Sequence, residues 1–258
     1  MPEADLTLLI RAAREAGNIA TRFTGPTAKR WDKPGGAGPV TEADLAVNEA
    51  LQTTLRSARP DYGWLSEETD DTSARLNCAR SFIIDPIDGT RSFIEGSNTW
   101  AHALAIAEHG TVTAAVIYLP LLDKLYSAST GAGAFLNATP IRTGSRDTLT
   151  GASILAAKPT FAEKHWRGPV PEISRAYRPS LAYRLSLVAE GRFDAMLTLR
   201  PTWEWDVAAG DLILREAGAL TSDRTGAALQ FNNPTPQVNG IIAANPVLHG
   251  SVVSALAP

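Results

Sequence analysis

The chain has 258 residues, of which 44% are hydrophobic and 20% are charged, as in a globular protein with one large domain or two closely packed halves. The formal net charge of −3 excludes a broad basic surface, so we expect neither polymeric nucleic acid nor a membrane among its partners. The single cysteine, Cys78, excludes an internal disulfide framework. Together with the acidic N-terminus and the lack of a long apolar run, it predicts a cytoplasmic protein.

Helical and strand patterns alternate in the first half of the chain. Apolar residues at helical spacing predict a helix over residues 6–23, and a second helix opens at 41–44 with Val47, Leu51 and Leu55 as its apolar stripe. A glycine-rich loop at 35–39 lies between the two helices. Apolar segments predict strands at 81–84, 101–108, 112–118 and 124–127, of which the second and third form an antiparallel pair. These elements predict an α+β half.

The second half has a different pattern, and it begins after a polar stretch at 140–150. We expect a boundary there, with one half at 1–145 and the other at 146–258. Strand, helix, strand and helix are predicted in turn at 152–157, 181–190, 195–199 and 207–217. This alternation is typical of an α/β half, and the sequence has no internal repeat.

The stretch Asp85-Pro86-Ile87-Asp88-Gly89-Thr90 directly follows an apolar strand. Two carboxylates at the edge of a core are costly unless a cation neutralises them, so the stretch predicts a divalent metal site. Pro86 rigidifies the turn, Gly89 permits a close backbone approach, and the Ile87 carbonyl is a third candidate ligand. If a helix begins after Thr90, its first amides can hold a phosphate. The alternative is a tight turn with an aspartate cap.

Three further acids are candidates, each with a structural alternative. Asp44 belongs to a capping box with Thr41, but the helical spacing also places it on the inward face, where an unpaired carboxylate is costly. Of the adjacent Glu67 and Glu68, which otherwise form a solvated loop pair, we expect only one to be functional. Asp206 precedes a helical pattern and is either its N-cap or a functional acid.

In this order, these stretches resemble the inositol monophosphatase superfamily of magnesium-dependent phosphatases over nearly the whole chain. The resemblance rests on Lys33, Pro39-Val40-Thr41-x-x-Asp44, Ser66-Glu67-Glu68, Asp85-Pro86-Ile87-Asp88-Gly89-Thr90, Gly131-x-Gly133-Ala134-x-x-Asn137, Trp205-Asp206-x-Ala208-Ala209-Gly210 and Glu216-Ala217-Gly218. It implies an α/β fold, a layered α/β/α/β/α sandwich with the active site between the two halves. A homodimer is common in such proteins.

The resemblance also implies roles for individual residues. Glu67, Asp85 and the Ile87 carbonyl would bind one Mg²⁺, and Asp85, Asp88 and Asp206 would bind a second. The catalytic residues would be Thr90, which holds the attacking water, Asp44, which orients Thr90, and Glu67, which positions the water through a further, weakly held metal. The residues at a small phosphorylated substrate would be Asp88, Gly89, Thr90, Ser180 and Asp206.

The choice of substrate depends on residues before Asp206. Inositol phosphatases carry a glutamate in this region that binds ring hydroxyls, but this chain has Thr198, Leu199 and Arg200 there. Pro201-Thr202 before the Trp-Asp pair is similar to the 3'(2'),5'-bisphosphate nucleotidase branch, which is our expected activity. Inositol-1-phosphate phosphatase stays an alternative. Histidinol-phosphate phosphatase is another, on the stretch Gly96-x-x-Thr99-Trp100.

A nucleotide substrate would need groups that bind a second phosphate and a base. Arg178, Arg184 or Arg200 could receive the phosphate, and Trp203 could stack on the base, although solvated arginines and a packed tryptophan are the simpler interpretations. A regulatory protein that binds macromolecules without catalysis is disfavoured, because every acid expected for catalysis is present.

Overall fold

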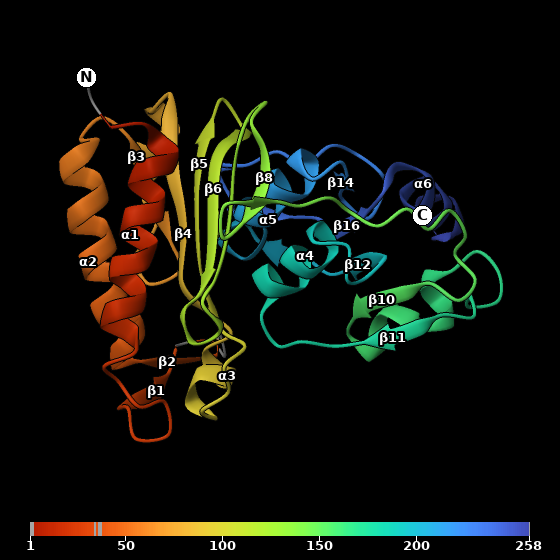
Figure 1. Ribbon diagram of the computed structural model, residues 1–258, viewed down its shortest axis with the longest axis horizontal. Coiled ribbons are helices and arrows are strands. Elements are labelled where there is room, and N and C mark those ends of the chain that lie inside the picture. Colours follow the sequence, from red (N-terminus) through yellow and green to blue (C-terminus); the bar gives the residue numbers. More distant parts are fainter. Residues whose placement is uncertain (1–2, 34, 36–37, 258) are drawn as a thin grey trace.

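Helices and sheets alternate in layers along the long axis of the molecule in the computed structural model, which describes residues 3–33, 35 and 38–257 (Figure 1). Helices α1 (Asp5–Ala20) and α2 (Glu42–Ala58) form the first outer layer and cover one face of a large sheet. Helices α4 (Leu181–Ala189) and α5 (Glu204–Glu216) cover its other face, and a second sheet and α6 (Pro246–Ala255) follow beyond them. The expected α/β/α/β/α sandwich is therefore confirmed.

The larger sheet has seven strands in the order β3-β4-β5-β6-β7-β8-β9. Its first pair is parallel and the others are antiparallel, so the chain folds as a meander from β4 onward. The strands are β3 (Gly63–Ser66), β4 (Arg80–Asp88), β5 (Ala101–Glu108), β6 (Thr111–Leu119), β7 (Lys124–Ser129), β8 (Gly133–Leu136) and β9 (Thr139–Pro140).

The smaller sheet has five strands in the order β11-β10-β12-β16-β14. Its β10 is parallel to β11 and to β12, whereas β16 is antiparallel to its neighbours β12 and β14. The strands are β10 (Ser153–Ala156), β11 (Ser174–Ala176), β12 (Ala195–Thr198), β14 (Leu220–Ser222) and β16 (Ile241–Ala244). Residues 141–152 connect the two sheets. The expected boundary between a half at 1–145 and a half at 146–258 falls within this connection and stays a proposal.

A short hairpin, a pair of short strands distant in the chain, and one short helix are also present. Strands β1 (Arg30–Asp32) and β2 (Pro39–Thr41) pair antiparallel before α2, and β13 (Thr202–Trp203) pairs with β15 (Gln237–Val238) at the start of α5. Helix α3 (Thr90–Ile94) begins directly after β4.

Buried apolar side chains between the layers hold the sandwich together. One core joins α1 and α2 to the first sheet and includes Leu8, Leu51 and Phe82. A second core, with Ile117 and Leu212, fills the space around α4 and α5 between the sheets. Burial of this apolar surface is the main favourable term in folding, so these cores fix the position of α5 relative to β4.

The sequence-based elements are confirmed in kind, and their ends differ by a few residues. The first helix ends at Ala20, and the last predicted helix begins at Glu204, which is three residues before the expected position 207. The β1–β2 hairpin, the β13–β15 pair, helix α6 and six strands were not predicted; these strands are β3, β8, β9, β11, β14 and β16. Of the expected glycine-rich loop at 35–39, residues 36 and 37 lie outside the described residues, and Pro39 belongs to β2. Across the part of the chain described, no helix is long and apolar enough to span a membrane.

Candidate metal centre and substrate cavity

Three aspartates from two elements meet at the end of β4. Asp85 and Asp88 lie on β4, and Asp206 lies on the first turn of α5. One carboxylate oxygen from each lies within 4.8 Å of the other two, and both β4 acids are buried whereas Asp206 is partly exposed. The helix begins with Trp203 as its N-cap, so the alternative that Asp206 is the N-cap is wrong. This set of carboxylates can hold a metal ion.

The end of β4 departs from regular strand pairing, which turns its carboxylates toward one place. The register with β5 shifts between Asp85 and Asp88, and Pro86 between them has no amide to donate. The Pro86 carbonyl instead meets Nδ1 of the buried His102 on β5 at 2.5 Å. Gly89 follows with φ of 93°, a left-handed conformation that glycine adopts without strain, and it is the N-cap of α3.

Asp88 also binds the N-terminus of α4, which belongs to the second half of the chain. Its carboxylate accepts from the Ser180 hydroxyl at 2.5 Å, the Ala182 amide at 2.6 Å and the Leu181 amide at 3.3 Å. The first amides of a helix favour an anion there. Ser180 is itself buried and caps α4 by accepting from the Tyr183 amide, and its expected role at the substrate stays a prediction.

Burial and like charge raise the pKa values of this acid cluster. Burial, followed by repulsion from Glu67 and Asp88, raises the pKa of Asp85 well above its usual value, and burial raises the pKa of Asp88 to about 6 against its hydrogen bonds with α4. Partial burial and the charges of Asp88 and Glu67 also raise the pKa of Asp206. One oxygen of Asp85 is buried without a hydrogen-bond partner. The cluster therefore concentrates negative charge that a bound cation would neutralise.

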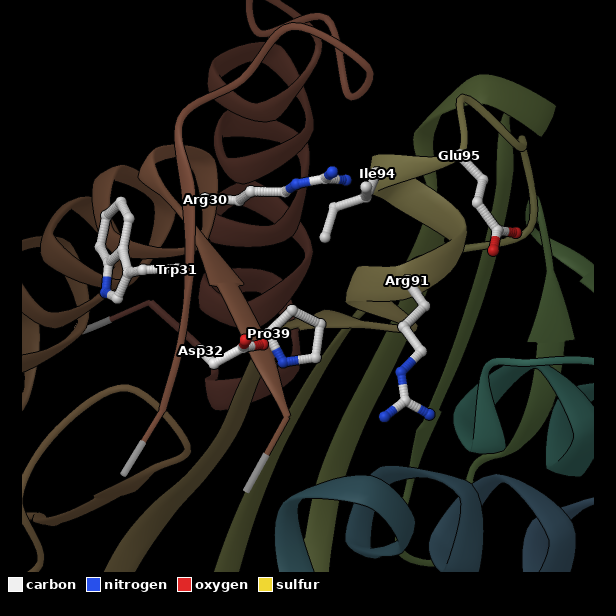
Figure 2. A pocket seen from close by; sticks show the side chains of 7 residues that line it. All are labelled: Arg30, Trp31, Asp32, Pro39, Arg91, Ile94 and Glu95. Carbon is white, nitrogen blue, oxygen red and sulfur yellow. The ribbon is translucent and has the colours of Figure 1, made fainter. Parts of the chain in front are cut away.

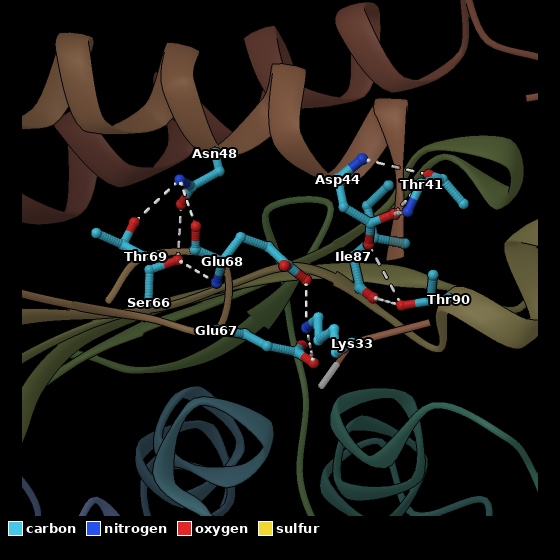
Figure 3. A network of polar contacts seen from close by, with 10 residues as sticks. All are labelled: Lys33, Thr41, Asp44, Asn48, Ser66, Glu67, Glu68, Thr69, Ile87 and Thr90. Atoms are coloured by element: carbon cyan, nitrogen blue, oxygen red, sulfur yellow. Dashed lines mark hydrogen bonds and ion pairs between the residues drawn. The ribbon is translucent and has the colours of Figure 1, made fainter. Parts of the chain in front are cut away.

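Asp44 and Thr90 lie within hydrogen-bond distance of each other, and the catalytic roles that the resemblance implies for them stay predictions (Figure 3). The Thr90 hydroxyl lies 3.3 Å from Oδ1 of Asp44 and 3.2 Å from the carbonyl of Ile87. The other oxygen of Asp44 accepts from the Thr41 amide at 2.8 Å and closes the capping box of α2. Asp44 is thus both a cap and an inward acid, and burial raises its pKa to about 6.

Lys33 joins Glu67 and Glu68 next to this pair (Figure 3). Its Nζ lies 2.8 Å from Oε1 of Glu67 and 2.7 Å from Oε1 of Glu68. Burial and the charge of Glu67 raise the pKa of Glu68 to about 7. Glu67 is close enough to repel Asp85, although it lies outside the cluster of three aspartates. Both glutamates therefore form an ion pair with the same side chain, that of Lys33.

A cavity of about 350 Å³ is lined by Asp88, Asp206 and three arginines. Arg91 comes from α3, Arg184 from α4, and Arg200 from the segment that leads to α5. Among the described residues, no ion pair includes any of these guanidinium groups. The cavity is therefore lined both by acids and by guanidinium groups that form no ion pair among the described residues.

The cavity wall also carries an aromatic ring. The guanidinium of the buried Arg184 lies 4.3 Å from the ring centre of Tyr177, which lines the cavity and is about half exposed. Trp203, the expected base-stacking residue, does not line this cavity, and its ring stacks on Trp205 with centres 4.8 Å apart. Arg178, another expected candidate, lies outside the cavity lining and over the ring of Phe193.

A second cavity, of about 490 Å³, adjoins the first through Arg91. It lies between the β1–β2 hairpin and α3, and Figure 2 shows Arg30 extending from β1 toward Ile94 on α3. Trp31 points to the other side of β1. Both cations and acids line this space, so it has no clear preference for charge.

Sequence reasoning gave no role in the cavity to Arg91, which it noted only as part of Arg91-Ser92-Phe93-Ile94, a stretch similar to the nucleotidase branch, and it missed Tyr177. Arg91 directly follows Thr90 on the first turn of a helix that the sequence did anticipate, so its position beside the acids was a usable signal. Tyr177 follows a short strand that no pattern indicated.

Comparison with known proteins gives one consistent family. The model of the inositol monophosphatase family matches residues 2–257. An inositol-1-monophosphatase of Mesorhizobium japonicum is 32% identical over 265 residues, which cover 97% of this chain and 95% of that protein. The Nus factor SuhB of Escherichia coli is 32% identical over 232 residues, covering 86% of this chain and 85% of that protein.

Solved structures agree with this likeness. The extragenic suppressor protein SuhB of Bartonella henselae has a TM-score of 0.82 at 29% identity and covers 98% of both chains. An IMPase of Thermotoga maritima has a TM-score of 0.82 at 28% identity, covering 96% of this chain and 95% of that one.

Proposed function

Because this chain belongs to the inositol monophosphatase family, a family of phosphatases, we propose that it is a magnesium-dependent phosphomonoesterase that hydrolyses its substrate by in-line attack of water. The observation that carries this proposal is the cluster of Asp85, Asp88 and Asp206, which opens directly onto the arginine-lined cavity. Acids for a metal and cations for an anionic substrate therefore share one space.

The donor set fits magnesium. All three carboxylates offer oxygen, the ligand type that Mg²⁺ prefers, and the partnerless buried oxygen of Asp85 is a ligand atom in need of a cation. We assign Asp85, Asp88 and Asp206 to one Mg²⁺, and Asp85, Glu67 and the Ile87 carbonyl to another. When bound, such ions neutralise phosphate charge and lower the pKa of water.

The residues beside the cluster have the arrangement needed to position water. The Thr90 hydroxyl can donate to Asp44 and accept from water, so Asp44 sets the direction in which the lone pairs of Thr90 point. For this role Glu67 must exchange its contact with Lys33 for the metal site. The Gly89 and Thr90 amides at the N-terminus of α3 would bind phosphate oxygens.

The finer activity that we propose is 3'(2'),5'-bisphosphate nucleotidase. A substrate phosphate at the acids would place the rest of the ester in the cavity, where Arg184 and Arg200 could bind a second phosphate. Arg184 already donates to the carbonyls of Arg178 and Pro179, and Arg200 to that of Pro201, so only their remaining N–H groups are available. Tyr177, whose ring is fixed by Arg184, is better placed than Trp203 to stack on a base.

A second candidate is inositol-1-phosphate phosphatase, because relatives with that name are 32% and 34% identical to this chain. Against it, Thr198 occupies the cavity wall without a carboxylate to bind ring hydroxyls. Trp100, on which the histidinol-phosphate alternative depends, is buried against Phe93 and His102.

The test is a comparison of adenosine 3',5'-bisphosphate, inositol 1-phosphate and histidinol phosphate at equal concentration, with and without Mg²⁺. We expect phosphate release that requires Mg²⁺ and is fastest with the bisphosphate. Faster release from inositol 1-phosphate would reject the nucleotidase assignment and keep the phosphatase. No release from any ester would reject catalysis and favour a binding protein. A cytoplasmic location and a homodimer stay predictions.

A further inference from the structure

We propose that Glu204 is a positioning residue for Asp206, acting through a buried set of hydrogen bonds that ties the first turn of α5 to the first half of the chain. The set consists of Asp71, Arg75, Glu204, Asn232 and Asn233, and we call it the Glu204 clasp. This inference rests on the proposed function, because it concerns how the Mg²⁺ ligands are held together.

The carboxylate of Glu204 is fully buried and has all its partners on one turn of the chain. Oε2 accepts from the Asn232 amide at 2.6 Å, and Oε1 accepts from the Asn233 amide at 2.9 Å and its Nδ2 at 2.8 Å. The Glu204 amide in turn donates to the carbonyl of Pro236 at 3.0 Å. Hydrogen bonds to a carboxylate are among the stronger ones in proteins, so the turn and the start of α5 move together.

Arg75 connects the same turn to the first half of the chain. Its guanidinium donates to Oδ1 of Asn232 at 2.7 Å and to the carbonyl of Asn233 at 2.8 Å. Asp71 accepts from the same group at 2.7 and 2.8 Å.

The backbone of Arg75 lies against the strands that carry the other metal ligands. A Cβ added to Gly63 on β3 would lie only 3.0 Å from the Cα of Arg75, so the two segments are in close contact. The Ser81 hydroxyl on β4 donates to the Arg75 carbonyl at 3.4 Å. The clasp thus runs from the segment beside β3 and β4 to the start of α5.

The position of Asp206 relative to β4 must be held by other contacts, because Asp85, Asp88 and Asp206 repel one another. Asp206 lies two residues after Glu204 on the same turn, and its carboxylate is within 4.8 Å of those on β4. Like charges at this distance favour separation of α5 from β4 when no cation is bound. By opposing this separation, the clasp keeps the metal ligands in place before the ion arrives, and such preorganisation raises affinity.

Helix α5 offers a matched control at its other end. The carboxylate of Glu216 accepts from the Gly131 amide at 2.9 Å and the Gly133 amide at 2.8 Å. These bonds, like those of Glu204, join a glutamate carboxylate on α5 to backbone amides of another segment, but Glu216 lies ten residues beyond Asp206. Its loss should lower stability without moving Asp206.

The experiment compares wild type with Glu204→Gln, Asn232→Gly and Glu216→Gln by Mg²⁺ titration calorimetry and thermal unfolding. Asn232 has φ of 61°, which glycine tolerates, so Asn232→Gly removes the side-chain bond to Arg75 and keeps the backbone. We expect the Kd for Mg²⁺ to rise about ten-fold in Glu204→Gln, as for other residues that hold metal ligands, and several-fold in Asn232→Gly. In Glu216→Gln it should stay within about two-fold of wild type although the unfolding midpoint falls.

Each outcome decides the proposal. Wild-type Mg²⁺ affinity in both Glu204→Gln and Asn232→Gly, or an equal loss in Glu216→Gln, would overturn the clasp and leave the proposed function intact. If Glu204→Gln does not fold, the affinity of Asn232→Gly decides alone. If wild type binds no Mg²⁺, the proposed function fails, and the clasp proposal fails with it.

Discussion

Replacement of Thr90 by alanine should separate rate from metal binding. The hydroxyl of this half-buried residue lies 3.3 Å from Asp44 and 3.2 Å from the Ile87 carbonyl, and it can donate to only one of them at a time. Its removal therefore costs about one hydrogen bond, or about 1 kcal/mol of unfolding free energy. For a chain of this length, that lowers the unfolding midpoint by about 2–4 °C. The fold should survive.

The expected effect on the rate is much larger. A group that positions the nucleophile and transfers its proton contributes about 10²- to 10⁴-fold, which corresponds to about 3–5 kcal/mol of activation free energy. We therefore expect kcat to fall by that factor in Thr90→Ala at saturating Mg²⁺, because the hydroxyl through which Asp44 would orient the water is removed.

The assay is steady-state phosphate release, with Mg²⁺ affinity measured separately by calorimetry. Thr90→Ser is the matched control, because it keeps the hydroxyl and loses only a methyl group, and it should retain most of the rate. The assignment of Thr90 is refuted if Thr90→Ala releases phosphate at near the wild-type rate, or if its main defect is weaker Mg²⁺ binding.

Further expectations concern the metal cluster, the cavity and pH. Asp88→Asn should abolish turnover and leave the protein folded by circular dichroism, because it relieves repulsion in the cluster; near-normal phosphate release would reject Asp88 as a ligand. Arg200→Gln should raise KM for adenosine 3',5'-bisphosphate about ten-fold or more and leave KM for inositol 1-phosphate unchanged, and an equal change for both would argue against a second-phosphate site. In EDTA, the urea midpoint should fall as pH rises from 4 to 7. The folded pKa values of Asp44 and Asp88, about 6, exceed the unfolded values, so each costs roughly 3 kcal/mol once ionised. A midpoint that rises over this range would contradict the burial of these acids.

Much of the fold and the acid cluster could be predicted from the sequence because the signals are local. The apolar strand that runs into Asp85 and Asp88 fixes their place at the end of β4, and helical spacing placed Asp44 inward. The sequence offered Asp44 as either a helix cap or a functional acid. In the structure one carboxylate oxygen accepts from the Thr41 amide and the other lies near the Thr90 hydroxyl, so the two interpretations are compatible.

Other features depend on contacts that a single sequence does not reveal. Helix α5 begins at Glu204, whose side chain accepts from the amides of Asn232 and Asn233, and neither residue is near it in the chain. The cavity likewise brings together Arg91 and Arg200 from segments more than a hundred residues apart. Tertiary contacts such as these override local propensity, which explains the errors at element ends.

The binding of Asp88 to the start of α4 has a consequence for the behaviour of the protein without ions. The contacts with Ser180, Leu181 and Ala182 join the two halves at the site through protein groups alone. When the supply of divalent cations falls, the halves should stay docked and only the activity should cease. Recovery on resupply then needs only the return of the ions, at the speed of diffusion and dehydration, with no refolding step.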